Sequence, residues 1–218
     1  MDDELTIDDT VTRWAPGDRD GRPLVVLLHG YGADEHDLFG VVPYLPDGIA
    51  VASLAAPLTP PWPMPGRSWY PIEDLSSRSP EPTTAAARAL LGWLDAAAST
   101  ASSVALLGFS QGAAVSLQAL RLAPERFDAV VALSGYATPG DLPGDDELRD
   151  LRPAVFWGRG TNDDVIPSDL IAHTALWLPE HSDLSGRVYQ GLTHSISDDE
   201  LRDVRAFLDK WLERIAAG

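Results

Sequence analysis

The sequence predicts an α/β fold in which a mainly parallel sheet of about seven strands is covered by helices on both faces. Short apolar runs alternate with segments of helical periodicity from residue 24 onward. The strand-like runs are continuously apolar, which is typical of parallel strands that are buried on both faces. A chain of 218 residues can bury a sizeable core, so we expect residues 1–218 to form a single domain.

Seven strands are expected, and most are short apolar runs that end in glycine or polar residues. The first is a short edge strand, and it follows an N-terminal segment, residues 1–9, that we expect to be loosely attached. The expected strands are residues 10–14, 24–28, 49–53, 104–107, 129–133, 154–157 and 187–190.

Helices are expected between these strands because leucine and alanine recur there at helical spacing. The last helix begins with a capping box, in which Ser197 is the N-cap and Glu200 stands three residues later. Residues 138–151 are polar and contain proline and glycine, so we expect a surface excursion there. The expected helices are residues 34–45, 84–98, 113–123, 168–178 and a last one after Ser197.

The composition argues against several classes of function. The 16 basic and 33 acidic residues give a formal net charge of −17, which makes nucleic acid and anionic membranes poor partners. No apolar run approaches the roughly 20 residues that a membrane span needs. The acidic N-terminus lacks the apolar region of a signal peptide, and the chain has no cysteine. We therefore expect a cytoplasmic protein without disulfides.

A candidate nucleophile stands between the fourth strand and the helix that follows it. Residues 108–112 read G-F-S-Q-G, which has the form G-x-S-x-G. A strand, a tight turn and a helix are the context of a nucleophile elbow, whose strained turn lifts the serine above the sheet. Flanking glycines leave room for the strand and the helix to approach each other. Ser110 is the candidate nucleophile, and the alternative is a turn that happens to contain serine.

A glycine-rich loop, H-G-Y-G at residues 29–32, ends the second strand. Such a loop lets backbone N–H groups point into a cavity, and beside a nucleophile elbow it supplies an oxyanion donor. The alternative is an ordinary connection between strand and helix. We expect His29 to be structural and to hold this loop through its ring nitrogens, since it stands at a strand end before glycines.

The general base is expected on a loop after a late strand, and His194 follows the last strand. His36, His173 and His181 lie on or beside expected helices, where solvated or capping roles fit them better.

The acid is expected on the loop after residues 154–157, where Asp163 and Asp164 are adjacent. The resulting chain order of serine, aspartate and histidine is the order found in α/β-hydrolases. Position alone does not choose between the two aspartates.

A long proline-rich connection, residues 56–82, is expected to line or cover an acyl pocket. It carries several aromatic residues, among which Trp69 and Tyr70 are the candidates for substrate binding. The alternative is that the tryptophans belong simply to the core.

Together these stretches resemble the phospholipase/carboxylesterase family of α/β-hydrolases, which includes carboxylesterases and acyl-protein thioesterases. The resemblance spans roughly residues 22–215, and four motifs in order make it specific. In this family the acid stands four residues before a proline, which selects Asp163 because residue 167 is Pro167. The matching stretches are residues 28–34, 66–70, 108–112, 160–167 and 192–197.

The resemblance implies an α/β-hydrolase fold and a reaction that needs no metal or cofactor. Ser110 would be the nucleophile, His194 the base and Asp163 the acid that orients it. The backbone N–H groups of Tyr31 and Gln111 would form the oxyanion hole. Tyr31 stands where related thioesterases carry leucine, so its bulk is expected to alter the pocket. Members of this family often form homodimers.

The expected activity is cleavage of carboxylic esters with short to medium acyl chains through an acyl-enzyme. Alternatives on the same triad are an acyl-protein or other thioesterase, a lysophospholipase, a lipase or a peptidase. A non-catalytic binding protein of the same fold would typically have lost a triad member. The expected substrate is therefore a small-molecule ester or thioester.

Overall fold

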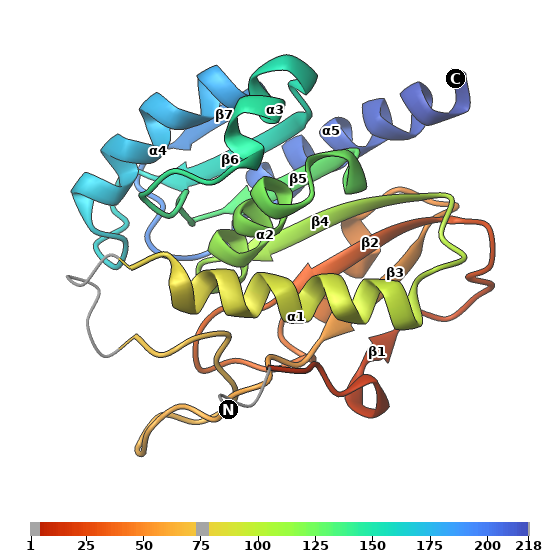
Figure 1. Cartoon of the computed structure of the whole chain (residues 1–218), viewed down its shortest axis with the longest axis horizontal. Coiled ribbons are helices and arrows are strands. Elements are labelled where there is room, and N and C mark those ends of the chain that lie inside the picture. The colour runs from red at the N-terminus through yellow and green to blue at the C-terminus, as the bar shows by residue number, and fades with distance from the viewer. Residues whose placement is uncertain (1–4, 73–78, 218) are drawn as a thin grey trace.

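The computed structural model describes residues 5–72 and 79–217 and contains a seven-stranded sheet in the order β1-β3-β2-β4-β5-β6-β7 (Figure 1). Strand β1 pairs antiparallel with β3, and the other neighbouring strands in this sheet are parallel. The predicted mainly parallel sheet is thus confirmed. The strands are β1 (Arg13–Trp14), β2 (Pro23–Leu28), β3 (Ala50–Leu54), β4 (Ser103–Phe109), β5 (Ala129–Leu133), β6 (Ala154–Gly160) and β7 (Asp183–Tyr189).

Helices cover both faces of the sheet (Figure 1). One core contains side chains of α1 (Glu81–Ala97), α2 (Gln111–Leu122), α3 (Gly144–Leu151) and α4 (Ser168–His181). The opposite core contains side chains of the 3-10 helix η2 (Leu38–Tyr44) and of α5 (Asp198–Ala217). The short 3-10 helices η1 (Asp9–Val11) and η3 (Pro124–Arg126) complete the described elements.

Strand β2 shows why the apolar runs are continuous. Leu24, Val26 and Leu28 belong to the core on the α1–α4 side. Val25 and Leu27 belong to the core on the α5 side. Because successive side chains of a strand point to opposite faces, a strand covered on both faces has to be apolar at every position.

The helix expected over residues 34–45 is the shorter 3-10 helix η2, and two further elements also differ from the sequence-based prediction. The expected surface excursion contains α3, whose Leu148 is fully buried. Strand β7 begins at Asp183 rather than at residue 187. The sequence did not reveal its first half because β7 is an exposed edge strand whose polar residues give no apolar run. The polar composition of both segments concealed their regular structure.

A buried ion pair fixes α3 against α2. The Arg121 guanidinium donates through Nε and one terminal nitrogen to the two Asp145 oxygens, each at 2.7 Å. The same guanidinium donates to the carbonyls of Thr138 and Gly140. Arg121 is almost completely buried, so these partners satisfy its charge away from water.

The N-terminal segment is closer to the body of the protein than we expected from the sequence. Ile7 packs against the core, and Asp9 Oδ1 accepts a hydrogen bond of 2.9 Å from the Trp93 indole. Within residues 5–9, these two contacts join the segment to the body of the protein. Residues 1–4 of that predicted segment lie outside the described residues.

None of the helices in residues 5–72 and 79–217 combines the length and apolar character needed to cross a bilayer.

Helix α5 makes only half of the predicted capping box. Ser197 Oγ accepts a hydrogen bond of 3.2 Å from the Glu200 N–H. The Glu200 carboxyl group is instead fully buried, and its two oxygens have no hydrogen-bond partner within the described part of the chain. It lies against Gly158, where an added Cβ would be 2.2 Å from Oε1. Burial raises the pKa of Glu200 to about 7.

Replacing Glu200 with glutamine is expected to reduce the loss of stability as pH rises. The folded state holds the Glu200 proton up to about pH 7, whereas the unfolded chain releases it near 4.5. Unfolding therefore releases this proton in that interval, and the contribution of Glu200 to stability falls as pH rises through it. Urea unfolding should be measured at pH 5 and at pH 8. The free energy of unfolding of the variant minus that of the wild type should increase by up to about 3 kcal/mol from pH 5 to pH 8.

The matched control is Glu213→Gln, which changes an exposed glutamate of the same helix. Equal pH dependence of Glu200→Gln and wild type would contradict the buried, protonated carboxyl.

Candidate active site

Ser110 occupies a strained turn between β4 and α2. Its backbone has φ 54° and ψ −115°, in the left-handed region that side chains rarely adopt. The two glycines of the motif make the turn possible, since an added Cβ would lie 2.4 Å from the Gly112 backbone at Gly108. At Gly112 it would lie 2.0 Å from the Leu28 carbonyl oxygen. These contacts produce the geometry of a nucleophile elbow.

The structure brings Ser110, His194 and Asp163 into one hydrogen-bonded chain. His194 Nε2 lies 2.9 Å from Ser110 Oγ, and His194 Nδ1 lies 2.8 Å from Asp163 Oδ2. An ionised carboxylate only accepts, so Nδ1 carries the ring proton and Nε2 is free to accept from the serine hydroxyl. The Phe109 ring packs beside the imidazole at 4.9 Å between centroids. This is the arrangement in which an imidazole can deprotonate a serine.

The carboxyl group of Asp163 is held by its own loop. Its Oδ1 accepts from the N–H groups of Val165 at 3.0 Å and Ile166 at 3.3 Å. Burial alone would raise its pKa, but hydrogen bonds from the His194 ring and these two N–H groups keep the pKa of Asp163 below its usual value. Asp164 is exposed, and it is Asp163 that accepts the hydrogen bond from His194 Nδ1.

The glycine-rich loop after β2 lies beside Ser110. An added Cβ at Gly30 would be 3.5 Å from Ser110 Cβ. Tyr31 and Gln111, the two predicted oxyanion residues, both line the cavity into which Ser110 opens. Gln111 is the first residue of α2, where helix N–H groups are unpaired within the helix and favour negative charge.

His29 holds this loop through both ring nitrogens, as the sequence predicted. Nε2 accepts a hydrogen bond of 3.1 Å from the Ala56 N–H, so the ring proton is on Nδ1. Nδ1 then donates to the Gly30 carbonyl oxygen at 2.7 Å. Burial lowers the pKa of His29, which keeps the ring neutral in this role.

The two aromatic candidates of the long loop, Trp69 and Tyr70, lie in different surroundings in the structure. Tyr70 lines the cavity, whereas Trp69 is completely buried and donates its indole N–H to the His29 carbonyl oxygen at 2.9 Å. The core alternative therefore holds for Trp69 in the described structure, and its expected place in the pocket wall is corrected. Residues 73–78 of the predicted pocket-lining loop lie outside the described residues.

The cavity above Ser110 has a volume of about 470 Å³ and is mostly apolar. Much of the cavity wall was not identified from the sequence. Tyr136 could have been identified, because it follows a strand that ends at the same sheet edge as Ser110. Besides Tyr31 and Tyr70, the apolar and aromatic walls include Ile72, Phe109, Tyr136 and Ile166.

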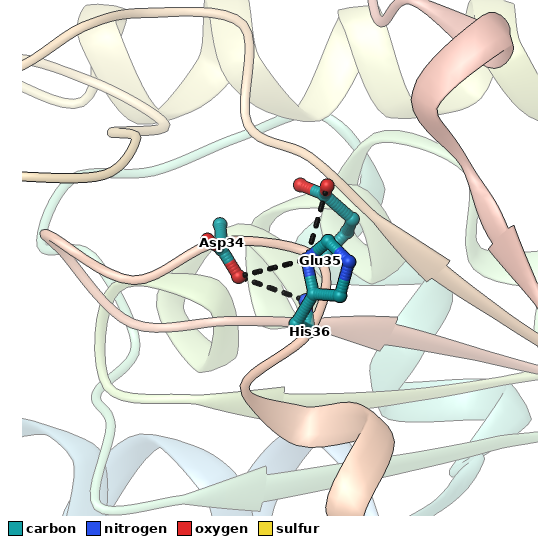
Figure 2. Close-up of side chains that lie close together, drawn as sticks. All are labelled: Asp34, Glu35 and His36. Atoms are coloured by element: carbon teal, nitrogen blue, oxygen red, sulfur yellow. Dashed lines mark hydrogen bonds and ion pairs between the residues drawn. The ribbon is translucent and has the colours of Figure 1, made fainter.

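Three potential metal ligands gather next to the glycine-rich loop, at Asp34, Glu35 and His36 (Figure 2). His36 Nδ1 lies 3.3 Å from an Asp34 oxygen and 3.2 Å from a Glu35 oxygen. The His36 N–H also donates to Asp34 Oδ1, so the cluster is a hydrogen-bonded turn. His36 is exposed, as expected from the sequence, and these contacts require no ion.

Solved structures share this fold, and some of them are named as esterases. Esterase PE8 matches with a TM-score of 0.76 and 28% identity over 95% of this chain and 99% of that chain. The Bacillus cereus carboxylesterase has a TM-score of 0.76 and 18% identity over 92% of this chain and 93% of its own, which shows the shared fold alone. The predicted α/β-hydrolase fold is confirmed.

A curated relative is acyl-protein thioesterase 1 of Saccharomyces cerevisiae, which is 33% identical over 93 residues. This match covers 41% of the chain and 41% of the yeast protein, so it spans less than half the length of that relative. Acyl-protein thioesterase 1 of Debaryomyces hansenii matches similarly, at 33% identity over 104 residues, 46% of this chain and 45% of that protein. A family model described as phospholipase/carboxylesterase matches residues 13–212. The chain therefore belongs to the phospholipase/carboxylesterase family of hydrolases, as its motifs indicated.

Proposed function

We propose that the protein is a serine carboxylesterase that hydrolyses esters of short to medium acyl chains. The observation that carries the proposal is the hydrogen-bonded chain from Ser110 through His194 to Asp163, which opens into an apolar cavity. A neutral, largely apolar wall suits an uncharged acyl group.

In the first half of the reaction, Ser110 Oγ attacks the ester carbonyl while His194 Nε2 takes its proton. Asp163 keeps the proton of the neutral ring on Nδ1 and stabilises the imidazolium that forms. The negative oxygen of the tetrahedral intermediate is held by the backbone N–H groups of Tyr31 and Gln111. His194 then protonates the leaving alcohol, and the acyl group stays on Ser110.

In the second half, water takes the place of the alcohol. His194 Nε2 accepts a proton from the water as it attacks the acyl-enzyme, and the carboxylic acid leaves when the proton returns to Ser110 Oγ. These steps need only side chains and backbone groups of this chain, together with water.

The test is hydrolysis of p-nitrophenyl esters from acetyl to palmitoyl. We expect kcat/KM to be highest among the short and medium chains and to fall toward palmitoyl, since the cavity of about 470 Å³ limits the length of chain it can bury. Absence of turnover above spontaneous hydrolysis for every chain would contradict the proposal.

A thioesterase activity is the second candidate, and the similarity to acyl-protein thioesterase 1 over 93 residues favours it. The same groups can attack a thioester, whose thiolate leaves with less help from a proton donor. Turnover of an S-acylated peptide with a higher kcat/KM than the best p-nitrophenyl ester would favour this candidate over the carboxylesterase.

A further inference from the structure

The cavity has an open end and a buried end. Val165 at its rim is 53% exposed, and Tyr31 and Ile72 are partly buried. Tyr70 and Tyr136 line the same cavity but are only 5% and 7% exposed. The two tyrosines therefore lie on the buried part of the cavity wall, which also includes Gln111, and we call this pair the floor of the cavity.

The floor is a hydrogen-bonded pair. The hydroxyl oxygens of Tyr70 and Tyr136 are 2.9 Å apart, so one hydroxyl donates to the other. Both rings also belong to the core on the α1–α4 side of the sheet, which closes the space behind them. Burial raises the pKa of Tyr136 and of Tyr70, so both hydroxyl groups stay protonated and the floor is uncharged.

The backbone of Tyr70 is tied to the nucleophile elbow through the side chain of Gln111. Gln111 Oε1 accepts from the Trp69 N–H at 2.8 Å, and Gln111 Nε2 donates to the Tyr70 carbonyl oxygen at 2.7 Å. Ser68 Oγ donates to the same carbonyl at 2.7 Å. Tyr70 therefore cannot move without breaking hydrogen bonds to the residue that follows the nucleophile.

The backbone on either side of Tyr136 is also held. The Trp157 indole donates to the Gly135 carbonyl oxygen at 3.0 Å, and the Ala137 N–H donates to Thr174 Oγ1 at 2.9 Å. The backbone beside both tyrosines of the floor is thus held by hydrogen bonds.

We propose that the Tyr70–Tyr136 pair is the specificity-determining floor of the acyl pocket and restricts the enzyme to short and medium acyl chains. The inference rests on the proposed function and names the residues that set its chain length. The Tyr70 segment is bonded to Gln111, which carries one oxyanion donor, so the floor lies beside the site of the carbonyl group. The leaving group has to face His194 Nε2, which protonates it, and the acyl chain takes the space above the tyrosines.

The test compares variants that change the floor by size. Tyr136→Leu shortens the side chain, and we expect the ratio of kcat/KM for octanoyl to that for acetyl p-nitrophenyl ester to rise at least about tenfold. Tyr136→Phe keeps the ring but removes the hydrogen bond, and the same ratio should rise about threefold. Tyr136→Trp fills the floor further, and butyryl should lose turnover relative to acetyl.

The matched control is Tyr44→Leu, which changes an exposed tyrosine outside the cavity wall and should leave the ratio unchanged. Titration with a fluorophosphonate counts the active sites in each sample, so a partly folded variant does not distort kcat. Tyr136→Phe retains the core volume and keeps the test decisive if Tyr136→Leu does not fold.

The possible failures are distinguishable. Wild-type protein that neither hydrolyses esters nor reacts with the fluorophosphonate would refute the proposed function itself. If the wild type is active but the Tyr136 variants leave its preference among acyl chain lengths unaltered, only the proposal that the tyrosine pair sets chain length is overturned. A shift seen only when the alcohol of acetate esters is lengthened would also overturn it, because the floor would then hold the leaving group.

Discussion

Replacing Ser110 with alanine will abolish ester hydrolysis and leave the fold intact. The loss in kcat/KM is expected to be at least about 10⁴-fold, because the nucleophile itself is removed. The fold should persist because the hydrogen bond from the Ser110 N–H to the Leu133 carbonyl oxygen and that from Ala114 N–H to Ser110 O involve only backbone. Turnover of p-nitrophenyl acetate and a thermal melt followed by circular dichroism measure the two effects.

Ser168→Ala is the matched control, because Ser168 is exposed at the start of α4 and outside the cavity wall. This variant should keep wild-type turnover and react with a fluorophosphonate, whereas Ser110→Ala should not react. Activity of Ser110→Ala within about tenfold of wild type would refute the assignment of Ser110 as nucleophile.

Asp163→Asn is expected to lower kcat by about 10⁴-fold while changing the side chain by one group. An asparagine that turns its amide toward His194 donates instead of accepting, so the ring proton would move from Nδ1 to Nε2. Nε2 could then no longer take the proton of Ser110. Steady-state kinetics of the variant and a pH profile of kcat would measure the effect.

Asp164→Asn provides the comparison, because Asp164 is the adjacent, exposed carboxylate. It should keep kcat within about threefold of wild type, as surface substitutions away from the reacting groups usually have small effects. A larger loss for Asp164→Asn than for Asp163→Asn would transfer the orienting role to Asp164.

The apolar runs and the motifs that end them predicted most of the sheet and of the candidate site. Residues 24–28 and 129–133 were expected as strands, and the structure has β2 at Pro23–Leu28 and β5 at Ala129–Leu133. Parallel strands bring their carboxyl ends to one edge, which is why loops distant in sequence could be expected to meet. Spacing did not separate Asp163 from Asp164, because adjacent residues differ in direction and not in position.

The remaining features depend on contacts that a linear pattern does not contain. Trp69 was a candidate for the pocket wall, but the His29 carbonyl oxygen offered its indole a buried partner. Tyr136 lines the pocket and its hydroxyl meets that of Tyr70, 66 residues away. Helix α3 has one fully buried leucine, Leu148, and Arg121 anchors its first turn through Asp145. Such tertiary partners cannot be read from local periodicity.

The residues that place Ser110 differ from the residues that contact a substrate at the rim of the cavity, so substrate preference can evolve while the position of Ser110 is kept. Gly112, in the first turn of α2, lies against the carbonyls of Leu28 and His29, so a close backbone contact between α2 and the end of β2 places Ser110. The rim of the cavity consists of side chains from other loops, including Tyr31, Ile72 and Val165. Those side chains can be exchanged without shifting the strands that place Ser110. Libraries randomised at these three positions should therefore yield many folded enzymes with new preferences, whereas randomising Gly112 should yield almost none.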